Sequence, residues 1–141
     1  MLRVVLIAMA AAAAIAADEG SLSKEMLAAH NAERAKVKSP PLVWSAALES
    51  VAREWAEQLA SSKQFYHKPK NKYGENLYEV RGAKATPAKV VERWAAEAQQ
   101  YDYKSNKCRG ACGHYTQLVW HNTREIGCAV AALASSPLPV R

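Results

Sequence analysis

The stretch from Gly113 to Cys128 reads GHYTQLVWHNTREIGC and carries the strongest fold signal in the chain. Large and polar side chains alternate from Tyr115 to Trp120, and a turn pair, Asn122-Thr123, follows. The residues from Ile126 to Leu133 are again mostly apolar. This order predicts two antiparallel strands, at 115–120 and 126–133.

Two of the three cysteines, Cys108 and Cys112, lie just before this stretch with Gly110 between them. We expect these two to pair by proximity, because glycine lets so short a loop turn. A zinc knuckle is the alternative, although the chain lacks the second matched pair of cysteines that such a site uses. Cys128 is left over, and we expect it to be a free thiol or to form an intermolecular disulfide.

Helical periodicity precedes the cysteines. A first helix is expected from Ser23, as its N-cap, to about Val37, where the prolines at 40 and 41 end it. Ser45 is expected to cap a second helix. That helix carries one apolar stripe, which predicts a core face: Leu48, Val51, Ala52, Trp55 and Leu59.

Further along, Glu75 to Val80 reads as a short extended segment. A third helix is expected from Thr86-Pro87 to about Gln100, because a capping residue followed by proline favours a helix start. Helices and strands both occur without a βαβ repeat, so the fold class is α+β. A chain of 141 residues fits one domain.

Four segments, in this order, closely resemble motifs of the CAP superfamily, also called the SCP or PR-1-like family. They are HNAER at 30–34, YGENL at 73–77, RWAAEAQQYDY at 93–103 and the stretch 113–128. The resemblance covers residues 22 to 132 or so and implies an α-β-α sandwich with a small antiparallel sheet between helices. The closing strand and signature of the family are absent, so we expect a C-terminally truncated domain with an open sheet edge.

The resemblance also implies a central cleft lined by two histidines and two glutamates. His67, Glu75, Glu97 and His114 match these positions. Two neutral imidazoles can ligate Zn²⁺, and two carboxylates can orient water or accept protons. We therefore expect a zinc site at His67 and His114 with Glu75 and Glu97 lining the cleft. These two glutamates are the candidates for a catalytic role.

Other histidines and the tryptophans are interpreted as structural. His30 is expected to hydrogen-bond inside the fold, as the resemblance implies for its motif, and His121 is expected to be exposed. The four tryptophans are expected in the core or in the cleft wall: Trp44, Trp55, Trp94 and Trp120.

The N-terminus has one basic residue, Arg3, and then an apolar run from Val4 to Ala17 that is too short to span a bilayer as a helix. Small residues before Asp18 offer a cleavage site. We predict a signal peptide at 1–17, a domain at 18–134 and an irregular Pro-rich tail at 135–141. A buried N-terminal helix is the weaker alternative. The prediction places the mature chain outside the cell or in the periplasm, where disulfides persist.

The net charge is +6, and removal of residues 1–17 leaves 18 basic against 13 acidic residues. A basic exported chain favours anionic surfaces such as phospholipid or acidic wall polymers. No nucleic-acid-binding motif is present, so nucleic acid is not an expected partner. The sequence leaves the oligomeric state open.

The sequence supports two main functions. The first is a non-enzymatic exported module that binds a lipid, sterol or envelope component. The alternative is a metal-dependent hydrolase of peptides or cell-wall material, with Glu75 or Glu97 as the base. A purely structural or protein-interaction role is a third hypothesis. The nucleophile motif GxSxG is absent, so a serine hydrolase is not expected.

Overall fold

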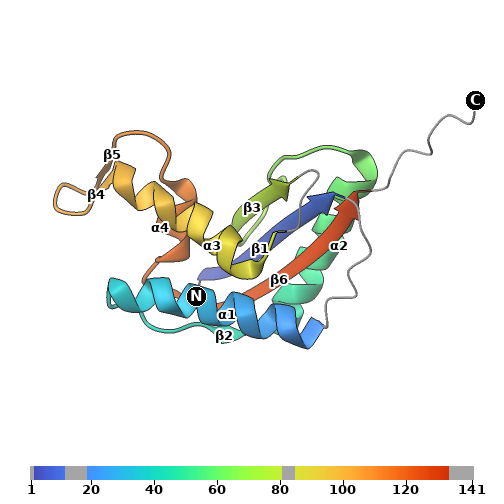
Figure 1. Cartoon of the computed structure of the whole chain (residues 1–141), viewed down its shortest axis with the longest axis horizontal. Helices are drawn as coiled ribbons and strands as arrows, with labels where there is room; N and C mark the ends of the chain where they lie inside the picture. The colour runs from blue at the N-terminus through green and yellow to red at the C-terminus, as the bar shows by residue number, and fades with distance from the viewer. Residues whose placement is uncertain (1, 12–18, 81–84, 134–141) are drawn as a thin grey trace, which may run out of the picture.

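A computed structural model describes residues 2–11, 19–80 and 85–133 (Figure 1). Its main sheet has four strands in the order β2-β6-β1-β3. Their bounds are Val43–Trp44 for β2, Thr123–Leu133 for β6, Leu2–Ala11 for β1 and Gly74–Val80 for β3. Every neighbouring pair in this sheet is parallel. A separate antiparallel pair joins β4, Tyr101–Asp102, to β5, Lys107–Cys108.

Helices cover both faces of the main sheet (Figure 1). Their bounds are Glu19–Lys36 for α1, Ala46–Ser62 for α2, Pro87–Ala95 for α3 and Gly113–Leu118 for α4, and a 3-10 helix, η1, at Ala96–Gln100 continues α3. The helix α2 packs on one face, whereas α1, α3 and α4 share a cluster on the other.

Alternation along β6 builds the two apolar layers. Ile126 and Cys128 join the cluster under α1 and α3, whereas Ala129 and Ala131 join the cluster under α2. Successive strand residues point to opposite faces, so β6 is buried on both sides. The α+β class and the three-layer arrangement are confirmed.

The direction of the strands differs from the prediction. We expected a small antiparallel sheet, but the main sheet between the helices is parallel and only β4–β5 is antiparallel. The segment predicted as a strand at 115–120 lies largely in α4. The alternation of large and polar side chains in this segment was misleading. The backbone N–H groups of His114 and Tyr115 donate to the Glu97 carboxylate, which starts a helical turn.

The helix boundaries were predicted closely at two of three starts. Thr86 caps α3, since its Oγ1 accepts from the N–H of Lys89 at 3.3 Å. Ser45 precedes α2 as expected but makes no side-chain capping bond. Ser23 is not a cap: α1 begins earlier, at Glu19, and the Ser23 hydroxyl donates to the carbonyl of Gly20.

The contact between α2 and β6 depends on Gly127. A Cβ built there would lie 2.1 Å from the backbone nitrogen of Glu49 and 2.4 Å from the carbonyl carbon of Leu48. Backbone atoms cannot swing aside as a side chain can. Glycine at this position therefore lets the first turn of α2 lie directly against the strand.

The apolar N-terminal segment, predicted as part of a signal peptide, forms β1 in this structure and pairs with β6 on one side and β3 on the other. It is a strand and not the helix considered as the alternative. Cleavage remains a prediction, since residues 12–18 lie outside the described residues. The predicted tail at 135–141 lies outside them too. Among the described residues, no helix is long and apolar enough to cross a membrane.

Candidate functional site

The four residues predicted from the sequence line one cavity of about 270 Å³. His67, Glu75, Glu97 and His114 are joined there by Asn76 and Gln117. They come from the loop before β3, from β3 itself, from η1 and from α4. The fold thus brings together His67 and His114, which are 47 positions apart in the sequence.

Glu75 on β3 holds the first histidine. Its Oε1 accepts from Nδ1 of His67 at 2.6 Å and from the N–H of Lys68 at 3.1 Å, and its Oε2 accepts from Asn71 at 3.3 Å. The Glu75 side chain is 4% exposed, whereas that of His67 is 65% exposed. A buried carboxylate therefore orients an imidazole at the mouth of the cavity.

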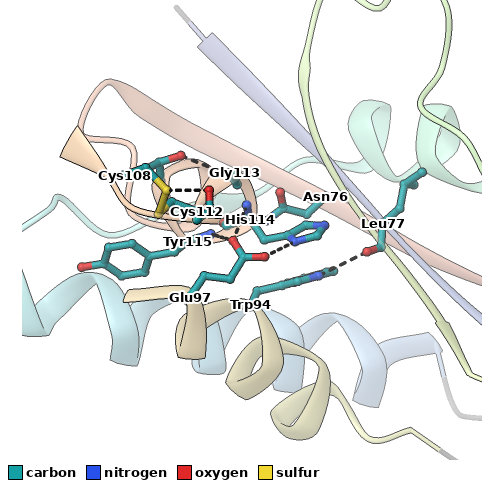
Figure 2. A network of polar contacts seen from close by, with 11 residues as sticks. Asn76, Leu77, Trp94, Glu97, Cys108, Cys112, Gly113, His114 and Tyr115 are labelled. Carbon is teal, nitrogen blue, oxygen red and sulfur yellow. Dashed lines mark hydrogen bonds and ion pairs between the residues drawn. A yellow bond between two sulfur atoms is a disulfide. The ribbon is translucent and has the colours of Figure 1, made fainter. Parts of the chain in front are cut away.

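Glu97 on η1 holds the second histidine in a similar way (Figure 2). Its Oε1 accepts from Nδ1 of His114 at 2.6 Å. Its Oε2 accepts from the N–H groups of His114 and Tyr115, at 2.9 and 3.1 Å, which are first-turn donors of α4. The carboxylate both caps the helix and sets the orientation of the imidazole.

Neighbouring groups fix the position of His114 further. Trp94 stacks on its ring, with centroids 6.1 Å apart and planes inclined by 20°. The Trp94 indole N–H donates to the carbonyl of Leu77 at 3.2 Å, which ties α3 to β3 (Figure 2). Buried Asn76 donates to the carbonyl of His114 at 3.0 Å. The imidazole is thus held from its face, its Nδ1 and its backbone.

Comparison with known proteins decides the family. A model of the cysteine-rich secretory protein family, CAP, matches residues 27–136. This chain belongs to the CAP family. It is 44% identical to pathogenesis-related protein 1A of Nicotiana tabacum over 108 residues, which are 75% of this chain and 64% of that protein. It is 33% identical to pathogenesis-related protein 1 of Arabidopsis thaliana over 126 residues, 89% of this chain and 77% of that protein. The chain therefore spans somewhat less than two thirds of the length of the tobacco relative.

The CAP cleft presents imidazole nitrogens. A carboxylate only accepts hydrogen bonds, so Nδ1 of each histidine is the donor, and Nε2 is the ring nitrogen that these two hydrogen bonds do not use. A histidine that donates through Nδ1 to a carboxylate is the usual arrangement of a metal-ligating imidazole. His67 and His114 thus fit as two nitrogen ligands. Within the described ranges, no group of three or more His, Cys, Asp or Glu side chains is arranged to hold a metal.

The cysteines of this CAP domain divide as expected. Cys108 and Cys112 form a disulfide, and Cys112 is the N-cap of α4. The bridge closes the loop that leads into the helix of His114. Cys128 is free and only 1% exposed, and burial raises the pKa of its thiol well above the usual value. This burial favours the free thiol over the intermolecular disulfide.

His30 lies away from the cavity, inside the fold, as the sequence predicted. Its Nδ1 donates to the carbonyl of Met26 at 2.7 Å, and its ring meets that of Trp94 edge to face. Burial lowers the pKa of His30 to about 4, against the raising effect of the hydrogen bond to Met26. This histidine is therefore a neutral structural residue.

Arg34, from the same HNAER motif, is completely buried. It donates to four backbone carbonyls, those of Pro40, Leu118, Trp120 and Thr123, at 2.8 to 3.1 Å. Burial, and next the charge of Arg124, lower the pKa of Arg34 to about 10. The guanidinium joins the end of α1 to the turn between α4 and β6, a role that the sequence did not reveal.

The helix α4 also borders a second cavity, of about 400 Å³. His114 and Gln117 point to the first cavity, whereas Tyr115 and Thr116 line the second. Exposed His121 is part of this second wall. Trp120 is 48% exposed and lines this second cavity. Of the other three tryptophans, Trp55 and Trp94 are buried in the core, as expected, and Trp44 is partly buried.

Two cleft residues were not singled out from the sequence. Asn76 and Gln117 lie beside the predicted glutamate and histidine, within the YGENL and GHYTQ segments that carry the resemblance. The Nε2 of Gln117 is buried without a hydrogen-bond partner in the part of the chain that the structure describes. Their positions within these two motifs were the sequence feature from which they could have been predicted as cleft residues.

Proposed function

We propose that this CAP domain is an exported, non-enzymatic module that binds a lipid, sterol or envelope component through the His/Glu cleft. The observation that carries the proposal is the hydrogen bonding of the Glu75 and Glu97 carboxylates. Each accepts a hydrogen bond from a histidine and from at least one backbone N–H: that of Lys68 for Glu75, and those of His114 and Tyr115 for Glu97. A glutamate engaged in this way orients a ligand-binding imidazole and is poorly placed to act as a mobile general base.

Zn²⁺ belongs to the same proposal. His67 and His114 would hold the ion through their Nε2 atoms, with Glu75 and Glu97 as the hydrogen-bond partners behind them. A bound zinc ion supplies a positive charge that attracts an anionic or polar oxygen of a ligand. The unpartnered amide nitrogen of Gln117 would add a donor on the same wall.

Export and contact with anionic surfaces are also proposed. The disulfide between Cys108 and Cys112 supports an oxidising compartment. The net charge of +6 supports attraction to anionic lipid or acidic wall polymers. A peptide- or wall-hydrolysing activity is the competing proposal, and the hydrogen bonding of both glutamates favours binding over it.

A zinc titration tests the cleft. Calorimetry should show Zn²⁺ binding to the parent protein and none to the H67A/H114A double variant, with affinity lost as the pH falls, because ligand imidazoles must be neutral. The matched control is His121→Ala, which alters an exposed histidine outside the cleft. Equal zinc affinity in the parent and the double variant would remove the metal from the proposal.

Vesicle binding separates the functions. Co-sedimentation with neutral vesicles, with sterol-containing vesicles and with vesicles of anionic lipid distinguishes ligand recognition from simple charge attraction. His114→Ala should weaken sterol or lipid capture and leave the salt-sensitive anionic component unchanged. Hydrolysis of a peptide or wall substrate that His114→Ala abolishes would instead establish the metal-dependent hydrolase.

A further inference from the structure

The second cavity, of about 400 Å³, shares none of its described lining residues with the His/Glu cleft. It is formed by the segment after α1, by α4 with the turn that follows it, and by the β4–β5 hairpin, which meet at one end of the molecule (Figure 1). Its volume falls within the range of small-molecule sites, roughly 300–1,000 Å³. The cavity is therefore large enough to hold a ligand of its own.

The lining of this cavity carries no fixed charge. Among the described residues that line it, none is Asp, Glu, Lys or Arg, although the chain has 19 basic and 13 acidic residues. A charged ligand would thus lose water there without gaining an ionic partner. Only Val37 and Val119 in the lining lack a side-chain polar group, so a hydrocarbon chain would cover hydroxyl, amide and ring N–H groups without pairing them. The lining suits a neutral ligand that is rich in hydroxyl groups.

Two aromatic side chains of the lining are open to solvent. Tyr103 is 85% exposed and Trp120 is 48% exposed. Each presents a broad apolar ring face together with a polar group at its edge, which suits partners that are themselves part apolar and part polar. A sugar ring is such a partner, because its C–H groups form an apolar face and its hydroxyl groups lie around the rim.

Asn106 supplies an oriented amide beside these rings. The Tyr101 hydroxyl donates to the Asn106 Oδ1, and this bond does not use the hydrogens on Nδ2. The backbone of Asn106 has a φ of 54°, a left-handed conformation that asparagine tolerates better than most residues. The Tyr101 ring in turn contacts that of Tyr115, with centroids 5.9 Å apart. The amide is thus held with its donors available to a ligand oxygen.

Buried hydrogen bonds hold two walls of the cavity together. The Ser39 hydroxyl donates to the carbonyl of Val119 at 2.7 Å. Arg34 bonds to the carbonyl of Pro40 on one side and to those of Leu118 and Trp120 on the other. These contacts join the segment after α1 to the end of α4.

A covalent link fixes the third wall. The disulfide between Cys108 and Cys112 joins strand β5 of the hairpin to the N-cap of α4. All three walls are therefore connected without any ligand. A pre-formed site loses less conformational entropy when a ligand binds, which favours affinity.

We propose that this cavity is a saccharide-binding site for a neutral oligosaccharide. A sugar ring lies against Tyr103 and Trp120, and its hydroxyl groups accept hydrogen bonds from the Asn106 amide. The site gives the domain a way to attach to a neutral polysaccharide while the His/Glu cleft stays free. It is separate from that cleft and does not rest on the function proposed for it.

Calorimetric titration of the full chain with two neutral glucose oligomers, laminarihexaose and cellohexaose, tests the site. At least one of them should bind, with an affinity that is the same at low and at high salt, because the ligand carries no charge. Binding should also change the tryptophan fluorescence, since Trp120 is exposed in the cavity.

Three variants should weaken binding, each roughly tenfold. Tyr103→Ala and Trp120→Ala each remove one ring, and the high exposure of Tyr103 means that its removal leaves the fold intact. Asn106→Asp keeps an acceptor for Tyr101 and tolerates the left-handed conformation, but it replaces the amide donors with an acceptor. Equal melting temperatures of the variants and the parent would exclude unfolding as the cause.

Two matched controls should bind the oligosaccharide as the parent does. Phe65→Ala removes an exposed aromatic ring that lies outside this cavity. The H67A/H114A variant removes the imidazoles of the His/Glu cleft. In the same way, Tyr103→Ala should leave zinc binding unchanged, so failure of one proposal is distinguishable from failure of the other.

Three results would overturn the saccharide site. One is the absence of binding by both oligosaccharides at millimolar concentration. Another is equal affinity in the parent and in all three cavity variants. The third is capture of sterol-containing vesicles that depends on Tyr103 and Trp120 in a protein that binds neither oligosaccharide, since the cavity would then hold an apolar ligand.

Discussion

Glu97 accepts two of its three hydrogen bonds from a single residue, His114, whose backbone N–H lies 2.9 Å from Oε2 and whose Nδ1 lies 2.6 Å from Oε1. The same carboxylate thus starts α4 and orients the imidazole that this helix carries. Helix capping and histidine orientation are coupled in one side chain. A substitution at this position should therefore change both the stability of the fold and the properties of the cleft.

Glu97→Gln should lower stability and weaken zinc binding together. A glutamine keeps one oxygen acceptor but places a donor against a donor, and the loss of charge weakens the capping of α4. We expect a loss of about 1–3 kcal/mol in unfolding free energy. Zinc affinity should fall roughly 10–100-fold, as for other partners of metal-ligating histidines. Denaturant unfolding and calorimetry measure the two effects.

The matched control for this prediction is Glu92→Gln, an exposed glutamate on α3 outside the cleft. It removes the same charge and should leave both measurements within error of the parent. A Glu97→Gln protein with normal stability and normal zinc affinity would contradict the role assigned to the carboxylate.

Arg34→Lys should be strongly destabilising although it keeps the charge. A lysine ammonium cannot reach carbonyls spread over Pro40, Leu118, Trp120 and Thr123, which the guanidinium satisfies at once. Buried carbonyls left unpaired each cost about 1–3 kcal/mol, so we expect a total loss of at least about 3 kcal/mol. Thermal and denaturant unfolding measure it. Arg93→Lys, at an exposed site on α3, should have no comparable effect, and equal effects at the two sites would refute this account.

His30 should make the fold sensitive to acid. Its pKa is lowered from 6.5 to about 4 in the folded protein, chiefly by burial. Between these values the unfolded chain binds a proton that the folded chain does not, so stability falls as the pH drops through this window. A shift of this size corresponds to about 3 kcal/mol of stability that is present above pH 6.5 and lost by about pH 4.

The comparison of His30→Gln with the parent isolates this contribution. Glutamine can still donate a hydrogen bond but does not titrate, so the unfolding free energy of the variant should depend less on pH between about 4 and 6.5. His121→Gln, which removes an exposed histidine, is the matched control variant. Parallel profiles for the parent and His30→Gln would show that His30 does not carry the effect.

Gly127→Ala should separate α2 from β6. The new Cβ would lie 2.1 and 2.4 Å from backbone atoms of Glu49 and Leu48, so the helix must move. Overpacking of this kind costs about 1–3 kcal/mol or more. Gly113→Ala is the control, because a Cβ there meets nothing within 4 Å. Melting temperatures should fall by roughly 2–8 °C for each kcal/mol lost; a similar small change for both variants would exclude a close contact at Gly127.

The sequence alone determined most of α2 and α3 and the four His and Glu residues that line the cleft. The apolar stripe of α2 and the Thr86-Pro87 start of α3 are local patterns, and local hydrogen bonding and periodicity suffice to place them. The pairing of Cys108 with Cys112 was predictable for the same reason, since only four positions separate them. The resemblance to the family supplied His67, Glu75, Glu97 and His114, which no local pattern would have connected.

Only the tertiary structure decided the conformation of 115–120 and the neighbours of each strand. The helix α4 forms because Glu97, seventeen positions before His114, accepts its first-turn N–H groups. The sheet brings together strands from distant parts of the chain, with β1 between β6 and β3 and β2 on the other side of β6. Strand partners and capping groups of this kind are contacts between remote segments, and their free energy depends on packing that no short window of sequence contains.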